Sequence, residues 1–484
     1  MLFNSYAFLL AFMPIVLAGM ALLRRFGHTR YLVPFLSIAS LAFYAYWDAR
    51  YAPLLITSII FNYFVGTALT KQAAPRQGTA LLWTGLVANL SLLGFFKYAG
   101  FFAENTNALL GTELYVVRMV LPLGVSFFTF TQIEYLVDAW RGTASRYSLG
   151  EYVLFVSFFP HLIAGPILCH REVIPQFSDG LRRFSERAFA TGVVFFALGL
   201  FKKTIIADSL APWVNESFAG VGSLTLVDAW AGALAYTLQL YFDFSGYSDM
   251  AVGLALMLNI RIPFNFDSPY KARSIAEFWR RWHITLSSFL RDYLYIPLGG
   301  NRKGLVRTMA NLMVTMLLGG LWHGAGWTFI LWGAWHGLLL SVNHAWRRTA
   351  LRTRPFMAWA MTLVAVVIGW VVFRAPTMEA AVRYLGSMAG INGVVLPPKY
   401  AAIVGWMHLP GLRFGELTAL SPSRFELKLL LLAGLLAFVA LLPNTQQLAE
   451  RIEPQFRWAV FVAACFFLGF LMVGRVAPFL YYQF

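Results

Sequence analysis

The chain has 484 residues, of which 59% are hydrophobic and only 12% are charged, and its mean hydropathy is +0.64. A soluble domain carries about 25% charged residues, so this composition excludes a soluble globular protein and predicts an integral membrane protein. The formal net charge of +16 is typical of cytoplasmic loops that accumulate Lys and Arg. Nucleic-acid binding is disfavoured because the basic residues lie in short loops between apolar spans. Cys169 and Cys465 offer neither a disulfide framework nor a zinc-binding spacing, so we expect no metal site.

Apolar stretches of about 20 residues, the length needed to cross a hydrocarbon core, recur along the whole chain. In lipid every backbone N–H and C=O must be satisfied within its own segment or by barrel closure, so we interpret these stretches as helices. The sequence predicts an all-α polytopic membrane protein, with one domain over residues 1–484 and about 11–12 transmembrane helices. The spans are expected near 6–23, 31–48, 53–70, 79–96, 115–137, 188–206, 226–244, 305–322, 327–343, 358–373, 427–443 and 457–473.

Two segments depart from this pattern of simple spans. Residues 151–170 are apolar but contain Pro160, Gly165 and Pro166 and have basic loops on both sides. Because proline and glycine free backbone groups in a spanning helix, a re-entrant hairpin is expected there. Residues 275–295 carry an apolar stripe at helical spacing within a basic stretch. This pattern predicts one amphipathic interfacial helix on the cytoplasmic side.

Ionisable residues at membrane depth are costly, and each is by default a functional hypothesis. His323 and His336 are thirteen positions apart and would point about 220° apart on one helix, so we expect Gly324-Ala325-Gly326 to fold them toward each other. A neutral imidazole can take a hydroxyl proton at neutral pH, which makes His323 a candidate general base. The structural alternative is a buried histidine bonded to a carbonyl. Asn343 shares the helix face of His336.

The basic stretch supplies a second group of candidate residues. Arg280 and Arg281 precede Trp282 and His283, and guanidinium groups pair bidentately with the phosphates of an anionic donor. Snorkelling to anionic lipid headgroups is the alternative, and the residues alone favour it.

Residues 241–250 carry two carboxylates, Asp243 and Asp249, beside a glycine. Such a pattern suits an ion or proton site, or a cap at Ser248 or Asp249 that begins the next helix. We favour the structural role.

Several motifs together resemble one known family. They are GFFKYAGFF (94–102), FPHLIAGPI (159–167), YFDFSGYSDM (241–250), PFNFDSPY (263–270), FWRRWHITLSSFLRDY (278–293), LWHGAGWTFILWGAWHG (321–337) and PFLYYQF (478–484). The chain resembles the membrane-bound O-acyltransferases, most closely the bacterial branch involved in alginate O-acetylation and D-alanylation of teichoic acids. The resemblance covers nearly the whole chain.

The resemblance implies a multi-helix fold around a central tunnel. His323 matches the family's essential histidine, and His336 matches a second recurrent histidine. His283 stands where many eukaryotic relatives have asparagine. With these matches, Arg280, Arg281, Trp282, His283 and Asn343 become candidates for donor binding or for supporting the two catalytic histidines.

The function we expect is an O-acyltransferase in the bacterial inner membrane. It passes a short acyl group such as acetyl to or toward an extracytoplasmic polysaccharide such as alginate. The donor is acetyl-CoA or another acyl thioester, no cofactor is bound, and the partners are membrane lipid and a periplasmic or membrane-anchored acyltransferase. The alternatives are a secondary transporter, for which buried His and Asp in broken helices are also suitable, and a non-catalytic acyl-conducting scaffold for a periplasmic transferase.

Overall fold

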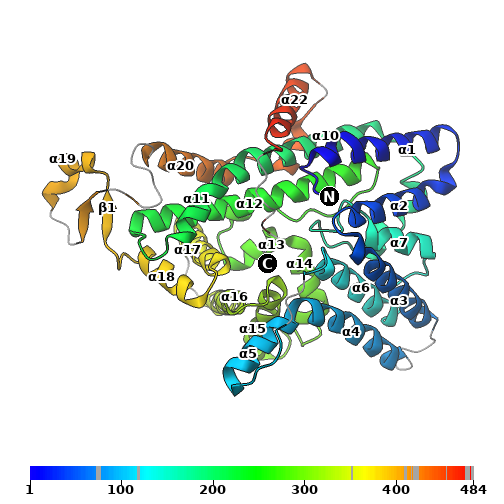
Figure 1. Ribbon diagram of the computed structural model, residues 1–484, viewed down its shortest axis with the longest axis horizontal. Coiled ribbons are helices and arrows are strands. Elements are labelled where there is room, and N and C mark those ends of the chain that lie inside the picture. Colours follow the sequence, from blue (N-terminus) through cyan, green and yellow to red (C-terminus); the bar gives the residue numbers. More distant parts are fainter. Residues whose placement is uncertain are drawn as a thin grey trace. The chain divides into compact units, whose positions relative to one another are not determined.

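The computed structural model describes residues 1–71, 78–116, 120–349, 353–407, 411–415, 417, 425–453, 455–474 and 480 (Figure 1). Helices make up most of this part of the chain. The strands within it are β1 (Val394–Leu396) and β2 (Leu412–Phe414), which pair in parallel with Val394 opposite Leu412. The motif predicted at 478–484 lies outside the described residues except for Leu480. The all-α class is confirmed.

Backbone contacts divide the chain into two compact units. Unit 1 comprises residues 1–201, 246–265 and 449–474, and unit 2 comprises residues 202–245, 266–448 and 475–484. Two helices, α12 (Leu226–Met257) and α21 (Thr445–Arg451), have residues in both units. The prediction of a single domain over 1–484 stays a prediction.

Unit 1 is built from helices that pack in pairs. In particular, α3 and α4 pack on α6, α2 packs on α7, and α10 packs on α22. The helices are η1 (Phe8–Phe12), α1 (Met13–Arg25), η2 (Thr29–Tyr31), α2 (Leu32–Ala45), η3 (Ala49–Tyr51), α3 (Ala52–Thr70), α4 (Thr79–Leu93), η5 (Gly94–Tyr98), α5 (Ala99–Leu110), α6 (Val125–Trp140), α7 (Leu149–Ser157), α8 (His170–Val173), α9 (Gln176–Asp179), α10 (Glu186–Phe201) and α22 (Phe456–Leu471).

Unit 2 holds the histidine-bearing motifs. Its α15 and α16 lie side by side (Figure 1), and α17 and α13 both pack on α16. The helices are η6 (Lys202–Ala207), α11 (Asp208–Ala219), η7 (Pro269–Lys271), α13 (Ile275–Arg281), α14 (Ile284–Leu290), η8 (Arg291–Tyr295), α15 (Gly304–His323), α16 (Trp327–Trp346), α17 (Pro355–Arg374), α18 (Met378–Met388), η9 (Pro398–Tyr400), α19 (Ala401–Val404), η10 (Gly405–Met407) and α20 (Phe425–Leu441).

Six helical stretches of the described residues are long and apolar enough to cross a membrane. They are Phe8–Arg25, Ala49–Thr70, Thr79–Leu110, Glu186–Ala219, Gly304–His323 and Pro355–Arg374; a seventh is the pair α20 and α21, bent by 64°. The polytopic character is therefore confirmed, but by this measure the spans are fewer than the 11–12 expected. Counting apolar residues in the sequence merged helices with their flanking loops. For example, the expected span 31–48 contains α2, which has 14 residues.

The segment predicted to be re-entrant is helical only at its start. Ser148 caps α7 through a capping box with Glu151, and the helix ends at Ser157. The following residues 158–169 are non-helical and almost all buried. Gly124 allows this segment to approach closely, since a Cβ there would lie 2.5 Å from the carbonyl oxygen of Leu162. Irregular backbone surrounded by protein is the condition under which a membrane tolerates it.

The motif at 241–250 does not end a helix. It lies within α12, which runs without a break over 32 residues. The predicted cap at Ser248 or Asp249 is therefore wrong. The glycine of the motif serves close packing instead, because a Cβ on Gly199 of α10 would lie 2.6 Å from the Gly246 carbonyl oxygen. A lone glycine costs a helix only about 1 kcal/mol, which such packing can offset.

Candidate active site

A glycine-rich hairpin positions the two histidines that the sequence singled out. Helix α15 ends at His323 and α16 begins at Trp327, so the predicted break at residues 324–326 is confirmed. The two helices then pack with their backbones in contact. A Cβ on Gly320 would collide with the carbonyl oxygen of Phe329, and a Cβ on Gly333 would collide with that of Met316. This close approach brings residues thirteen positions apart to the same region.

Three histidines gather in unit 2, all of them buried. The ring centroids of His283 and His323 are 6.4 Å apart. Trp332 lies between His323 and His336. Its ring is 5.1 Å from that of His323 and 4.9 Å from that of His336. The structure therefore brings His283, His323 and His336 into one continuous group of rings, which we call the histidine cluster.

His283 enters this cluster through an unusual backbone conformation. Its φ of 44° and ψ of 54° are left-handed, and they divide the basic stretch into α13 and α14, followed by the π-helical turn η8. The single amphipathic helix predicted over 275–295 is therefore wrong. A non-glycine residue in this region of φ/ψ space costs about 1–3 kcal/mol and persists where surrounding packing over-determines it. Such strained residues concentrate at functional sites.

A hydrogen bond fixes the orientation of His336. The indole Nε1–H of Trp279 donates to Nδ1 of His336 at 3.3 Å. A donor at Nδ1 places the ring proton of a neutral imidazole on Nε2. Gly369 of α17 faces that nitrogen, since a Cβ there would lie 2.9 Å from Nε2. The ring is therefore held between α13 on one side and α17 on the other.

Aromatic side chains surround the histidine cluster. The ring of Phe373 lies 5.3 Å from that of His323, and Trp332 packs against Trp279 at 5.7 Å. Such a surrounding excludes water and lowers the effective dielectric, which strengthens electrostatic interactions within the site. Trp279 and Phe373 were not among the predicted site residues. Trp279 could have been found from the sequence, since it lies four positions before the site residue His283. Nothing in the sequence marks Phe373.

The residues predicted to bind the donor differ in burial and in ion pairing. Arg281 is engaged by Glu277 at 3.0 Å and by Asp267 at 3.4 Å, whereas Arg280 is exposed. Trp282 is buried and stacks on Phe278. Half-buried Asn343 lies about 10 Å further along α16 than His336 at 1.5 Å per residue, and among the described residues it makes no contact with the histidine cluster.

The cationic character of this region extends to a neighbouring loop. The ammonium group of Lys271 donates to the Leu442 carbonyl at 2.6 Å. Desolvation, and then the charge of Arg281, lower the pKa of Lys271 from its usual value. A site rich in cations that are not all neutralised by carboxylates attracts anions. Of the predicted donor-binding arginines, Arg280 is the one whose position suits an anionic ligand best.

A buried charge cluster, missed by the sequence reasoning, lies elsewhere in unit 2. The Lys203 ammonium contacts Asp208 at 2.6 Å and Asp243 at 2.5 Å. Asp243 also accepts the backbone N–H of Leu480 at 3.1 Å. The sequence marked Asp243 as a possible ion site or structural residue, but its partner Lys203 lies 40 positions earlier in the chain. The cluster joins η6, α11 and α12.

These features define a polytopic helical membrane protein with a dry, aromatic site that holds three histidines. Residues 76–378 match the membrane-bound O-acyltransferase family. The chain belongs to this family, as the motifs predicted, and the family consists of acyltransferases.

Two of the relatives described below match it over about four fifths of its length, and a third matches about half. The chain is 44% identical over 428 residues to a peptidoglycan O-acetyltransferase of Helicobacter pylori, covering 82% of this chain and 81% of that protein. It is 46% identical over 396 residues to a probable alginate O-acetylase of Azotobacter vinelandii, covering 80% and 78%. A teichoic acid D-alanyltransferase of Streptococcus thermophilus is 30% identical over 242 residues, covering 47% and 57%.

Proposed function

We propose that this protein is an O-acyltransferase that transfers an acetyl group from a cytoplasmic thioester donor to or toward an extracytoplasmic polysaccharide. The named relatives act as O-acetylases of peptidoglycan and, by their names, of alginate. This similarity supports an acetyl group and a polysaccharide acceptor. The chain's own contribution to the argument is the histidine cluster, because moving an acyl group onto a hydroxyl requires a base in a place sheltered from water.

His323 acts in this proposal as the general base. Its imidazole takes the proton of the acceptor hydroxyl while the hydroxyl oxygen attacks the thioester carbonyl carbon. The carbon–sulfur bond then breaks, and the departing thiolate receives the proton from the imidazolium. The products are an ester on the acceptor and a free thiol. Exclusion of water by the aromatic surround protects the thioester from hydrolysis.

The other two histidines position the reaction. The bond from Trp279 fixes the ring of His336 with its Nε2–H toward Gly369 of α17, and through Trp332 this ring supports the position of His323. His283 and Trp332 each lie against the ring of His323. Arg280 supplies a contact for a phosphate group of the donor, as acetyl-CoA would carry.

The proposal extends to location and partners. A multi-span protein with basic cytoplasmic loops that serves an exported polysaccharide would lie in the bacterial inner membrane. The acceptor is then either the polysaccharide or a hydroxyl of a periplasmic or membrane-anchored acyltransferase that relays the acyl group.

The observation that carries the proposal is the convergence of His283, His323 and His336 from three separate helical segments into one buried cluster. The test is His323→Ala, compared with His344→Ala as a matched control, because His344 also lies on this hairpin, where its Nε2 is hydrogen-bonded to Arg348 at 3.3 Å. We expect both variants to insert normally and only the first to abolish acetylation of the polysaccharide in cells. Retained acetylation in His323→Ala would remove this histidine from the mechanism.

Purified protein separates the remaining alternatives. In nanodiscs, the enzyme should cleave a short acyl thioester when an acceptor or partner is supplied. Donor binding without cleavage, in the presence of the partner, would instead identify an acyl-conducting scaffold. Accumulation of a solute in proteoliposomes without any acyl transfer would identify a transporter.

A further inference from the structure

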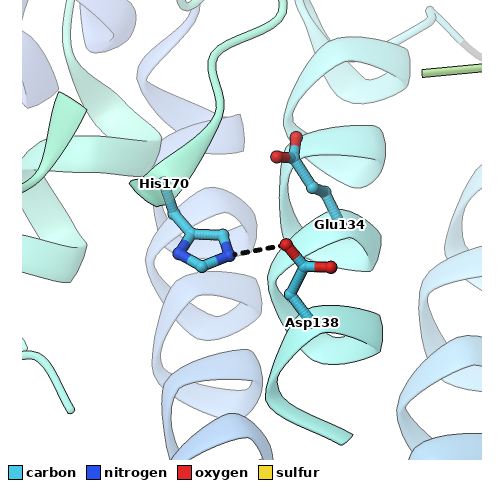
Figure 2. A group of neighbouring side chains, drawn as sticks. All are labelled: Glu134, Asp138 and His170. Carbon is cyan, nitrogen blue, oxygen red and sulfur yellow. Dashed lines mark hydrogen bonds and ion pairs between the residues drawn. The ribbon is translucent and has the colours of Figure 1, made fainter. Parts of the chain in front are cut away.

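Three metal-ligating side chains meet inside unit 1, away from the motifs used above. Glu134 and Asp138 are one turn apart on α6, and His170 is the first residue of α8. Figure 2 shows both carboxylates and the imidazole directed into the same space between the two segments. One ligand atom from each residue lies within 4.8 Å of the others. All three residues are at most 4% exposed.

The distances suit a small divalent ion. Nε2 of His170 is 3.2 Å from Oδ2 of Asp138. Two ligand atoms on one tetrahedral zinc ion, with bonds of about 2.1 Å, are about 3.4 Å apart. This pair already has the required separation, and a carboxylate oxygen of Glu134 lies within 4.8 Å of both atoms.

Glu134 has the strongest reason to take a metal ion. The ion pairs of this cluster are made by Asp138, which contacts His170 at 3.2 Å and Arg171 at 3.0 Å, whereas Glu134 lies one turn before it and is equally enclosed. A buried carboxylate is costly unless a positive charge or hydrogen bonds compensate for its lost hydration. A metal ion shared with Asp138 and His170 would supply that charge.

Outer contacts complete the arrangement. The Tyr147 hydroxyl is 2.9 Å from Nδ1 of His170, the position from which a neighbouring group fixes the tautomer of a metal-bound imidazole. Arg171 contacts Oδ2 of Asp138 at 3.0 Å, and a carboxylate retains further lone pairs for a metal.

We propose that Glu134, Asp138 and His170 bind a zinc ion that ties α6 to α8. An imidazole ligand favours zinc over magnesium or calcium, and a zinc ion held by three protein ligands keeps its fourth position for water. The sequence predicted no metal site because it offered no paired cysteines, whereas two of these ligands lie more than 30 positions before the third.

The test is metal binding by the full-length protein. The chain is purified in detergent with a tag that contains no histidine, and its metal content is measured by inductively coupled plasma mass spectrometry. We expect about one zinc ion per chain, because these ligands form a single metal site. His170→Gln and Glu134→Gln should each weaken zinc binding by more than about 100-fold. Mutating even a residue that only contacts a metal ligand lowers metal affinity by about 10–100-fold.

His161→Gln serves as the matched control. His161 is equally buried in the same non-helical segment, but it donates to the Phe155 carbonyl at 2.8 Å, so this variant should keep its zinc.

Two results would overturn the proposal. The first is a wild-type protein without zinc that also fails to bind added zinc saturably; Glu134, Asp138 and His170 would then form only an ion-pair network. The second is equal zinc content in the wild type and the His170→Gln and Glu134→Gln variants. Neither depends on acyl transfer, so the zinc site and the proposed enzymatic function fail independently.

Discussion

The bond from Trp279 to His336 gives the sharpest prediction about the candidate active site. Trp279→Phe keeps an aromatic ring against His336, where the two rings now lie 5.3 Å apart at 86°, but it removes the indole N–H. His336 then loses the donor that holds its ring proton on Nε2. Both the tautomer and the direction of the Nε2–H become free to change, while the polarity of the surroundings changes little.

The size of the effect follows from the hydrogen bond. At 3.3 Å this bond is long, and a net value of about 1 kcal/mol is appropriate for a neutral pair. Since 1.36 kcal/mol corresponds to about tenfold, losing the bond shifts the tautomer ratio about fivefold. We therefore expect the maximal rate of acyl transfer to fall, by at most about fivefold, with the donor KM nearly unchanged because no donor contact is removed.

The assay compares two matched variants in nanodiscs. Trp335→Phe removes an equivalent indole donor from the same region, but that donor bonds to the Ala365 carbonyl at 2.9 Å. Both variants should lower the unfolding free energy by about 1 kcal/mol, measured by thermal unfolding. Only Trp279→Phe should slow thioester-to-acceptor transfer.

Two outcomes would refute this reasoning. A wild-type transfer rate in Trp279→Phe would show that the orientation of His336 does not matter. An equal loss of rate in Trp335→Phe would show that the effect comes from general loosening of the hairpin.

Three further predictions test the packing around the site and the buried charges. Gly369→Ala should lower the transfer rate, because its Cβ would lie 2.9 Å from the imidazole Nε2, whereas Gly434→Ala, which meets nothing within 4 Å, should leave the rate unchanged. His283→Asn should preserve thermal stability because asparagine tolerates positive φ, while His283→Val should lower it by about 1–3 kcal/mol; equal melting temperatures would contradict the assigned strain. Lys203→Met should destabilise the protein by about 3–5 kcal/mol by leaving buried carboxylates unpaired. Adding Asp243→Asn should recover part of that loss, and a simple sum of the two effects would contradict the ion pairing.

The sequence predicted the arrangement of the hairpin histidines because local geometry determines it. A turn of 100° per residue forbids His323 and His336 from sharing a face on one helix, and the intervening glycines offered the break. The membrane class followed from composition for an equally direct reason, since so few charges cannot cover a surface in water.

Features set by tertiary packing were not predictable in the same way. The apolar spacing over 275–295 fits a continuous helix, and no glycine or proline marks the left-handed backbone at His283. Packing between distant segments imposes that conformation. Likewise, Gly246 was read as a possible helix end, but the approach of α10 makes it an interior residue of α12. The partners of Asp243 and His170 lie tens of positions away, beyond any local pattern.

The glycine contacts between α15 and α16 also constrain how substrates reach His323. With the carbonyl of Met316 pressed against Gly333 and that of Phe329 against Gly320, no gap between these helices can admit even a methyl group. An acyl chain or a sugar therefore cannot pass between α15 and α16 at these positions. Both must reach His323 from outside the hairpin. The hairpin is thus a closed wall at these positions.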